Sequence, residues 1–274
     1  MKKILNTILV INLLLAYSCK KNVDTSVSAT EKAKSIYELV RPKSDWNGNI
    51  SISASNSMYQ PTLQNFDINA YFEDAKGIPT KADIFQVGQV AVDETPNFRY
   101  YTHIFGKMPN RDKIVDELFG KQVKIVIKSQ GFGDVTYSMY SPSYVNIELP
   151  TDVANTLKFN KSQGLTIKWN PDNSLSTRGD VEKQVGVSVV YHAGYTSNLE
   201  QTGMPKENVT AFKLANDAAG QVTFTPQELA KLPVNGNVCI YVARANQEVA
   251  TSTSGQKLGI TSFSMGYSPE VKTQ

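Results

Sequence analysis

The most restrictive feature of this sequence is a long succession of short segments in which apolar and polar residues alternate. A period of two is typical of β-strands that bury one face. The clearest segments are Asn65–Phe72, Gln122–Lys128 and Leu165–Trp169. Residues that favour turns, chiefly Gly, Asn, Asp and Pro, separate the segments at short intervals. The pattern therefore predicts an all-β protein built from antiparallel, Ig-like β-sandwiches.

The same pattern continues through most of the chain after residue 45. Further strands are predicted at 48–54, 82–87, 89–92, 98–105, 135–140, 144–149, 185–191, 210–215, 221–225, 238–243 and 258–265. Pro150 closes the first group of strands. We therefore expect one sandwich domain over residues 45–150 and a second over residues 151–274, since each length suits a single domain. The last residues, Pro269–Gln274, are expected to be a polar tail.

Only one or two short helices are expected in the two domains. Thr225–Leu229 begins with a threonine cap, a proline at the first helical position and a glutamate at the third. Residues 111–119 fit another helical turn or two after Asn110. Before the domains, Glu31–Val40 is a third short candidate. Its apolar residues share one side and are Ala33, Ile36, Tyr37 and Val40.

The amino-terminal residues have the features of an export signal. Two lysines precede Ile4–Ala16, which is apolar except at three positions. That length suits a signal peptide and is short for a helix that crosses about 30 Å of hydrocarbon. We expect the signal peptide to cover residues 1–18. The polar residues 19–44 then form a tether that begins with Cys19.

The end of this signal, Leu14-Leu15-Ala16-Tyr17-Ser18-Cys19, resembles the lipobox of bacterial lipoproteins. The resemblance implies cleavage between Ser18 and Cys19. It also implies lipidation of Cys19 by diacylglycerol and fatty acids such as palmitate, which would anchor the chain in a lipid bilayer. We expect the cell outer membrane, with the body facing either the periplasm or the exterior. The alternatives are an ordinary cleaved signal followed by an incidental cysteine, and an uncleaved membrane anchor.

Two motifs in the body also resemble a known group. The first is Ala70-Tyr-Phe-Glu-Asp-Ala-Lys-Gly77, and the second is Phe224–Pro233 followed by the strand Val238–Arg244. Both are similar to segments of uncharacterised two-domain β-sandwich lipoproteins of Gram-negative bacteria. The resemblance implies the two-domain architecture but no activity, because that group has no general function.

Composition excludes several classes of protein. Without Lys2 and Lys3, the chain keeps 26 basic residues against 25 acidic ones, so it lacks the basic excess of a nucleic-acid binder. There are two cysteines. If Cys19 is acylated, Cys239 has no partner for a disulfide. Cys239 lies in an apolar strand, where it fits the role of a small buried hydrophobic residue.

The sequence contains no recognisable catalytic or metal motif. The two histidines, His103 and His192, have no His, Cys or acidic partner at metal-ligand spacing. No G-x-S-x-G elbow or phosphate-binding loop is present. The paired acids fall in predicted turns and on a short helix, whereas glycoside hydrolysis needs two carboxyls across a cleft. We therefore expect no enzyme activity and no cofactor, and a glycan-active enzyme is the least favoured alternative.

Tyrosines are the better candidates for ligand contacts. Tyr140 and Tyr144 flank a proline turn, and Tyr195 lies in the predicted polar loop 194–208. Exposed aromatic rings stack on sugars or anchor protein partners. The alternative is that these rings pack at sandwich edges. Trp46 and Trp169 are expected to be core residues.

These observations favour a membrane-anchored envelope lipoprotein that acts as a non-enzymatic binding or structural accessory module. Its expected partner, besides the bilayer, is a glycan or another envelope protein. A fimbrial or adhesin-like subunit is the alternative. Some such subunits are matured by cleavage after an arginine, and Arg41 is the candidate here, although Pro42 disfavours cleavage.

Overall fold

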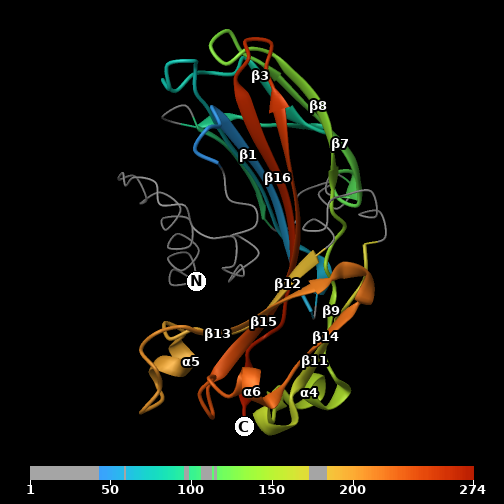
Figure 1. Cartoon of the computed structure of the whole chain (residues 1–274), viewed down its shortest axis with the longest axis vertical. Coiled ribbons are helices and arrows are strands. Elements are labelled where there is room, and N and C mark those ends of the chain that lie inside the picture. Colours follow the sequence, from blue (N-terminus) through green and yellow to red (C-terminus); the bar gives the residue numbers. More distant parts are fainter. Residues whose placement is uncertain (1–42, 59, 96–98, 106–112, 114–115, 173–183) are drawn as a thin grey trace, which may run out of the picture. The chain divides into compact units, whose positions relative to one another are not determined.

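The structure is a computed structural model, and it describes residues 43–58, 60–95, 99–105, 113, 116–172 and 184–274 (Figure 1). The signal peptide, Cys19 and most of the tether lie outside the described residues. Two of the predicted helices, Glu31–Val40 and most of residues 111–119, do so as well.

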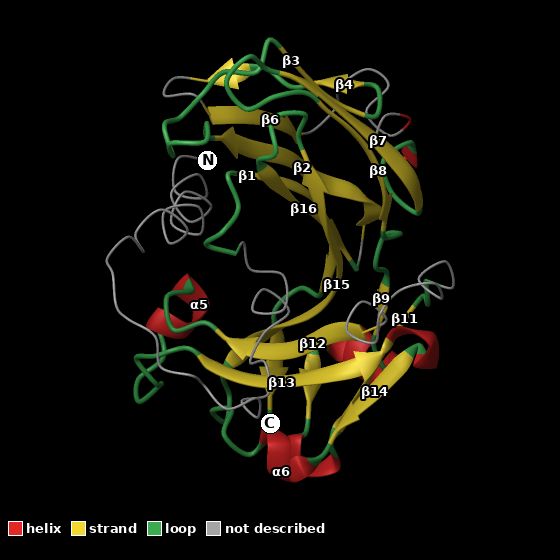
Figure 2. Ribbon diagram, turned by 45° about the horizontal axis from the view of Figure 1, so that its top comes forward, coloured by secondary structure: helices red, strands yellow, loops and turns green. Residues whose placement is uncertain are grey.

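Strands dominate the described residues, as Figure 2 shows, and this confirms the predicted all-β class. In the first half they are β1 (Gly48–Ser57), β2 (Gln60–Phe72), β3 (Ile84–Val87), β4 (Val90–Ala91), β5 (Glu94–Thr95), β6 (Arg99–Phe105), β7 (Lys121–Lys128), β8 (Val135–Ser141) and β9 (Ile147–Glu148). In the second half they are β10 (Lys158–Phe159), β11 (Leu165–Trp169), β12 (Gln184–Tyr191), β13 (Val209–Asn216), β14 (Gln221–Phe224), β15 (Asn237–Thr251), β16 (Lys257–Tyr267) and β17 (Val271–Thr273).

The helices in the described residues are short. They are α4 (Thr151–Thr156), α5 (Thr196–Leu199), α6 (Pro226–Leu229) and the 3-10 turns η1 (Lys161–Gln163) and η3 (Asp217–Ala219). The capping box of α6 is confirmed, because the Thr225 hydroxyl accepts from the Glu228 amide and the Glu228 carboxylate accepts from the Thr225 amide. The sequence did not predict α4 and α5, which are too short to show a helical period. Among the described helices, none has the length and apolar character needed to span a bilayer.

The strands form three sheets. The largest has the order β10-β17-β15-β16-β1-β2-β6-β5, with β12 paired to β15 and β13 paired to β12. The second sheet is β4-β3-β7-β8 and the third is β14-β11-β9. Most neighbours are antiparallel. The pairs β1–β16 and β10–β17 are parallel, and β1–β16 joins Gly48–Ser57 to Leu258–Tyr267 along the whole length of β1 (Figure 1).

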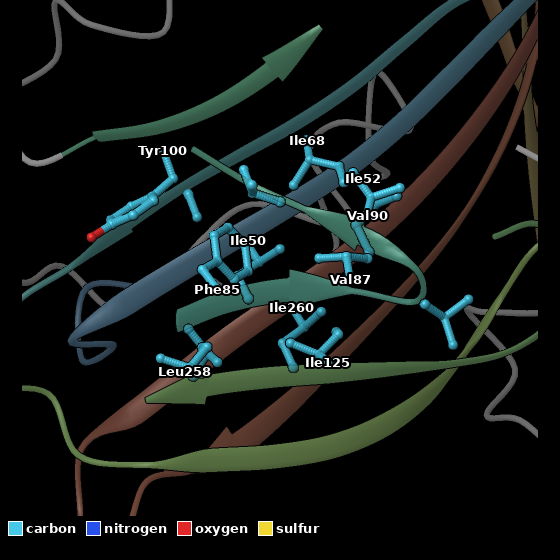
Figure 3. Packing of buried hydrophobic residues seen from close by; sticks show 14 of the residues in the cluster. Ile50, Ile52, Ile68, Phe85, Val87, Val90, Tyr100, Ile125, Leu258 and Ile260 are labelled. Atoms are coloured by element: carbon cyan, nitrogen blue, oxygen red, sulfur yellow. The ribbon is translucent and has the colours of Figure 1, made fainter. Parts of the chain in front are cut away.

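The first core lies between β16-β1-β2-β6 of the large sheet and the sheet β4-β3-β7-β8. Inward side chains of the two layers interdigitate, as in a sandwich. Figure 3 shows part of this cluster, with Ile50, Ile52, Ile68, Phe85, Val87, Val90, Tyr100, Ile125, Leu258 and Ile260 labelled.

The second core lies between β12, β15 and β17 of the large sheet and the sheet β14-β11-β9. Trp169 is buried here, which confirms the prediction, and its indole Nε1 donates to the Asp217 carboxylate at 2.9 Å. Trp46 is also buried, but it packs over Gly259 on the opposite face of the large sheet.

The long hairpin β15–β16 contributes to both cores. Ala250, Leu258 and Ile260 belong to the first core, whereas the β15 residues 238, 240 and 242 belong to the second. Residues 45–150 therefore do not complete the first core by themselves, and the boundary at residue 150 stays a prediction. The expected polar tail also contains a strand, because Val271 in β17 is fully buried in the second core.

Candidate functional site

Four polar or aromatic side chains gather where β12 ends and β15 begins. We call His192, Tyr195, Cys239 and Tyr241 the tyrosine cluster. Cys239 and Tyr241 alternate along β15 with residues of the second core, so the pleat directs them to the opposite face of the sheet. His192 directly follows β12, and Tyr195 precedes α5.

The Tyr241 hydroxyl is the centre of this cluster. It lies 3.1 Å from Nε2 of His192 and 3.2 Å from the hydroxyl of Tyr195. The rings of His192 and Tyr195 lie face to face, with centroids 4.5 Å apart and planes 33° from parallel. The Cys239 thiol hydrogen-bonds to both tyrosine hydroxyls. The cluster therefore combines stacked rings with a chain of neutral hydrogen-bonding groups.

Asn198 holds the loop that carries Tyr195. This side chain is almost fully buried, and its amide donates to the carbonyls of His192 (2.9 Å) and Asn237 (3.0 Å). Its carbonyl oxygen accepts from the Asn237 amide at 2.9 Å. Three bonds from one side chain thus join the loop to the first residue of β15. The cluster is fixed in place before any ligand arrives, which lowers the entropic cost of binding.

Burial keeps the whole cluster uncharged at neutral pH. It raises the pKa of Tyr195 to about 12, and it also raises the pKa values of Tyr241 and Cys239. The same desolvation lowers the pKa of His192. A buried thiol with a raised pKa is a poor nucleophile. The arrangement is suited to binding neutral polar groups rather than to nucleophilic catalysis.

The lowered pKa of His192 gives a testable pH dependence. The unfolded chain takes up a proton near pH 6.5, whereas folded His192 does so only at lower pH. Stability from neutral His192 is therefore present above about pH 6.5 and is lost as the pH falls through the folded pKa. NMR titration should give His192 a pKa below 6.5, with His103→Gln used to assign the two histidine signals. A value above 6.5 contradicts the buried geometry.

The other two tyrosines predicted as ligand contacts do not join the cluster. Tyr140 is 8% exposed, and its hydroxyl donates to the Asp172 carboxylate at 2.9 Å. Tyr144 is partly buried and stacks on Phe119, with centroids 5.0 Å apart. Both positions fit the alternative interpretation, in which these rings pack within the sandwich. Tyr195 alone of the three lies in a group of polar side chains that are partly accessible.

Sequence reasoning missed a buried ionic group around Arg244. This arginine is fully buried, and its guanidinium lies 3.3 Å from the Asp217 carboxylate and 3.8 Å from that of Asp172. It also donates to the Ser143 hydroxyl at 2.9 Å and to the Asn170 carbonyl. The only signal in the sequence was the Ala-Arg dipeptide in the resemblance to envelope lipoproteins.

Burial dominates the electrostatics of this group. It raises the pKa of Asp217, although the positive charge of Arg244 acts in the opposite direction. It also lowers the pKa of Arg244, which the two aspartates counteract. Charges this deeply buried are tolerated only when they are paired and hydrogen-bonded. The group is therefore structural, and it ties β15 to the segments that hold Ser143, Asp172 and Asp217.

The remaining predicted sites are not placed by the structure. Ser18 and Cys19 lie outside the described residues, so cleavage and lipidation stay predictions. Within the part of the chain that the structure describes, no group of three His, Cys, Asp or Glu side chains is arranged to hold a metal ion.

Neither protein-family models nor curated protein sequences match this chain. Among solved structures, a 1.5-MDa bacterial ice-binding adhesin is 10% identical, covering 85% of this chain and 66% of that one, with a TM-score of 0.23. A Ca²⁺-stabilized adhesin of an Antarctic bacterium is 10% identical over 82% of this chain and 48% of that one, with a TM-score of 0.21.

A tetra-tandem repeat from the extending region of a large adhesion protein is 12% identical over 80% of this chain and 49% of that one, with a TM-score of 0.20. This chain thus spans from about half to about two thirds of the length of these three chains. TM-scores this low support no conclusion about this protein. What its own fold and site define is an all-β protein with two cores and a fixed, uncharged tyrosine cluster.

Proposed function

We propose that this protein is a lipid-anchored binding protein of the bacterial envelope, and that the tyrosine cluster binds a neutral, hydroxyl-rich ligand such as a glycan. The observation that carries the ligand class is the combination of stacked rings and uncharged hydroxyls at Tyr195 and Tyr241. Sugars are recognised by such surfaces, because their apolar ring faces stack on aromatic rings and their hydroxyls both donate and accept hydrogen bonds.

The charge beside the cluster supports a neutral ligand over an anionic one. The Glu270 carboxylate lies close enough to interact electrostatically with His192, Tyr195 and Cys239. It also accepts a hydrogen bond of 2.6 Å from the Ser197 hydroxyl at the start of α5. A fixed negative charge next to a partly desolvated site repels phosphates and acidic sugars. Leu199 on the same short helix is 69% exposed and adds an apolar surface nearby.

The same geometry supports binding rather than hydrolysis in this proposal. Cleavage of a glycosidic bond uses two carboxyls, one with a raised pKa, on either side of the bond. Glu270 is the one carboxylate that acts on the described residues of the cluster, and it is exposed. Tyr195, Tyr241 and Cys239 all stay protonated at neutral pH, so none provides a base.

Replacing Tyr195 with alanine tests the proposed ligand site. We expect the wild-type protein to bind at least one neutral oligosaccharide from a panel such as maltohexaose, cellohexaose and xylohexaose. Tyr195→Ala should weaken that binding by about tenfold, since it removes the stacked ring and one hydroxyl of the chain (~1.4 kcal/mol). Isothermal titration calorimetry measures the change.

Tyr71→Ala is the control, because Tyr71 is 38% exposed on β2, outside the tyrosine cluster. It should leave the affinity unchanged. An equal loss in both variants, or tight binding only of anionic glycans, contradicts the proposed site.

A second candidate, the adhesin-like subunit, is favoured by one strand edge. Within the described residues β13 pairs only with β12, so its other edge presents backbone donors and acceptors over Val209–Asn216. Such an edge can accept a strand from another envelope protein or from another subunit.

A further inference from the structure

A second apolar surface lies on the face of β15 and β16 that points away from both cores. We call Ala243, Ala245, Phe263 and Met265 the outer patch. Residues 243 and 265 are register partners across the hairpin, as are residues 245 and 263. Their neighbours point the other way, because the hydroxyl of Ser262 contacts Ser141 of β8 at 2.6 Å. The patch therefore belongs to neither sandwich core.

The outer patch is buried although it lies outside the two cores. Ala243, Ala245 and Phe263 are 3%, 4% and 7% exposed. The sheets β4-β3-β7-β8 and β14-β11-β9 pack on the other face of the large sheet, where the cores are. An apolar aromatic side chain this well buried needs a cover on its own side of the sheet.

The described chain begins on the same face as the outer patch. The Trp46 ring packs over Gly259 so closely that a Cβ there would lie 1.9 Å from a ring carbon. Asp45 pairs with the Lys257 ammonium at 2.6 Å, and the Asn47 amide donates to the Lys257 carbonyl. Gly259 is two pleats from Phe263 on β16, so both lie on one face. The residues before Lys43 thus start beside the patch.

The distances fit a short preceding segment. Four residues along β16 separate Trp46's contact at Gly259 from Phe263, which is roughly 13 Å. The six residues from Val40 to Trp46 can extend over about 20 Å. The eight residues 33–40 would span about 12 Å as a helix. This segment can therefore reach the patch and cover it.

We propose that residues 33–40 pack on the outer patch as a short helix, with Ala33, Ile36, Tyr37 and Val40 against Phe263 and Met265. The sequence places these four apolar residues on one side of the predicted helix. A helix this short is not stable alone in water, so its formation depends on the patch. The proposal does not rest on lipidation or on the tyrosine cluster.

The docked segment shortens the connection between Cys19 and the body. Residues 19–44 would extend about 90 Å as a free tether. With residues 33–40 docked, only residues 19–32 remain free, and their reach falls to about 50 Å. Docking therefore decides how far the body can stand from the point of anchorage.

Hydrogen exchange of the full chain, followed by mass spectrometry, tests the docking. Amides at 36–40 should exchange at least tenfold more slowly than their intrinsic rates, because an undocked helix of this length gives no such protection. Met265→Glu places a charge in the patch and should abolish the protection. Thr251→Glu is the control, since Thr251 is exposed and lies on the same face of β15; protection should remain.

A second pair of variants changes the segment and leaves the body untouched. Tyr37→Asp should remove the protection, whereas Ser35→Asp, on the opposite side of the predicted helix, should keep it. Intrinsic exchange rates at 36–40 in the wild-type protein overturn the proposal. So does a dimer that Met265→Glu converts to a monomer while exchange at 36–40 stays unchanged, because a second copy would then cover the patch.

Discussion

Replacing Arg244 with alanine is expected to lower the free energy of unfolding by about 3 to 5 kcal/mol. The change leaves the carboxylates of Asp217 and Asp172 in a buried site without their positive partner. It also removes the donors to the Ser143 hydroxyl and the Asn170 carbonyl. A loss of this size is a large part of the stability of a typical protein. Urea denaturation measures it.

Two further variants separate the buried charge from the loss of packing. Arg244→Met combined with Asp172→Asn and Asp217→Asn should recover much of the loss, since no unpaired buried charge remains. Lys81→Ala is the surface comparison, because it breaks an exposed ion pair of 2.9 Å with Glu94 and should change stability by less than about 1 kcal/mol. Equal effects of Arg244→Ala and Lys81→Ala contradict the role assigned to the buried group.

Cys19→Ala is expected to move the protein from the membrane fraction to the soluble fraction. Each buried methylene of an acyl chain contributes about 0.8 kcal/mol, and two or more chains hold a protein on the bilayer almost permanently. Without the thiol, the chain loses the acceptor for the lipid that the lipobox resemblance implies. Cell fractionation followed by immunoblotting measures the redistribution.

Cys239→Ala is the control for this experiment, because Cys239 is a buried free cysteine in β15 and should have no influence on fractionation. A Cys19→Ala protein that stays with the membranes refutes the lipoprotein proposal. Mass spectrometry of the wild-type envelope form separates the two proposed functions. A mature chain that begins at acylated Cys19 supports the anchored binding protein, whereas polymers of chains that begin at Pro42 support the adhesin-like subunit.

The alternation of residues predicted the strands well, because each strand buries one face. Leu165–Trp169 was predicted with the bounds that β11 has, and the cap of α6 was readable from Thr225 and Glu228. The partners of the strands were not predictable in the same way. A period of two says which face of a strand is buried, but not which strand lies beside it, so the parallel pairing of β1 with β16 was missed.

Only one member of the tyrosine cluster was identified from the sequence. Tyr195 stood out because it lies in a polar loop. Cys239 and Tyr241 were hidden in an apolar run, since residues on both faces of β15 are mostly buried and the run shows no alternation. His192 was judged alone because its partner, Tyr241, is 49 residues away. Arg244 was missed for a similar reason, as its aspartates come from distant segments.

The pairing of β1 with β16 has a consequence for the order in which the protein can fold during synthesis. Gly48 pairs with Leu258, so the first core waits for residues that the ribosome adds almost last. Contacts this distant in sequence form slowly, and until they form the edge of β1 and its apolar face remain open to wrong partners. Loss of the last two dozen residues would therefore damage not only the carboxyl-terminal half but also the half that is made first.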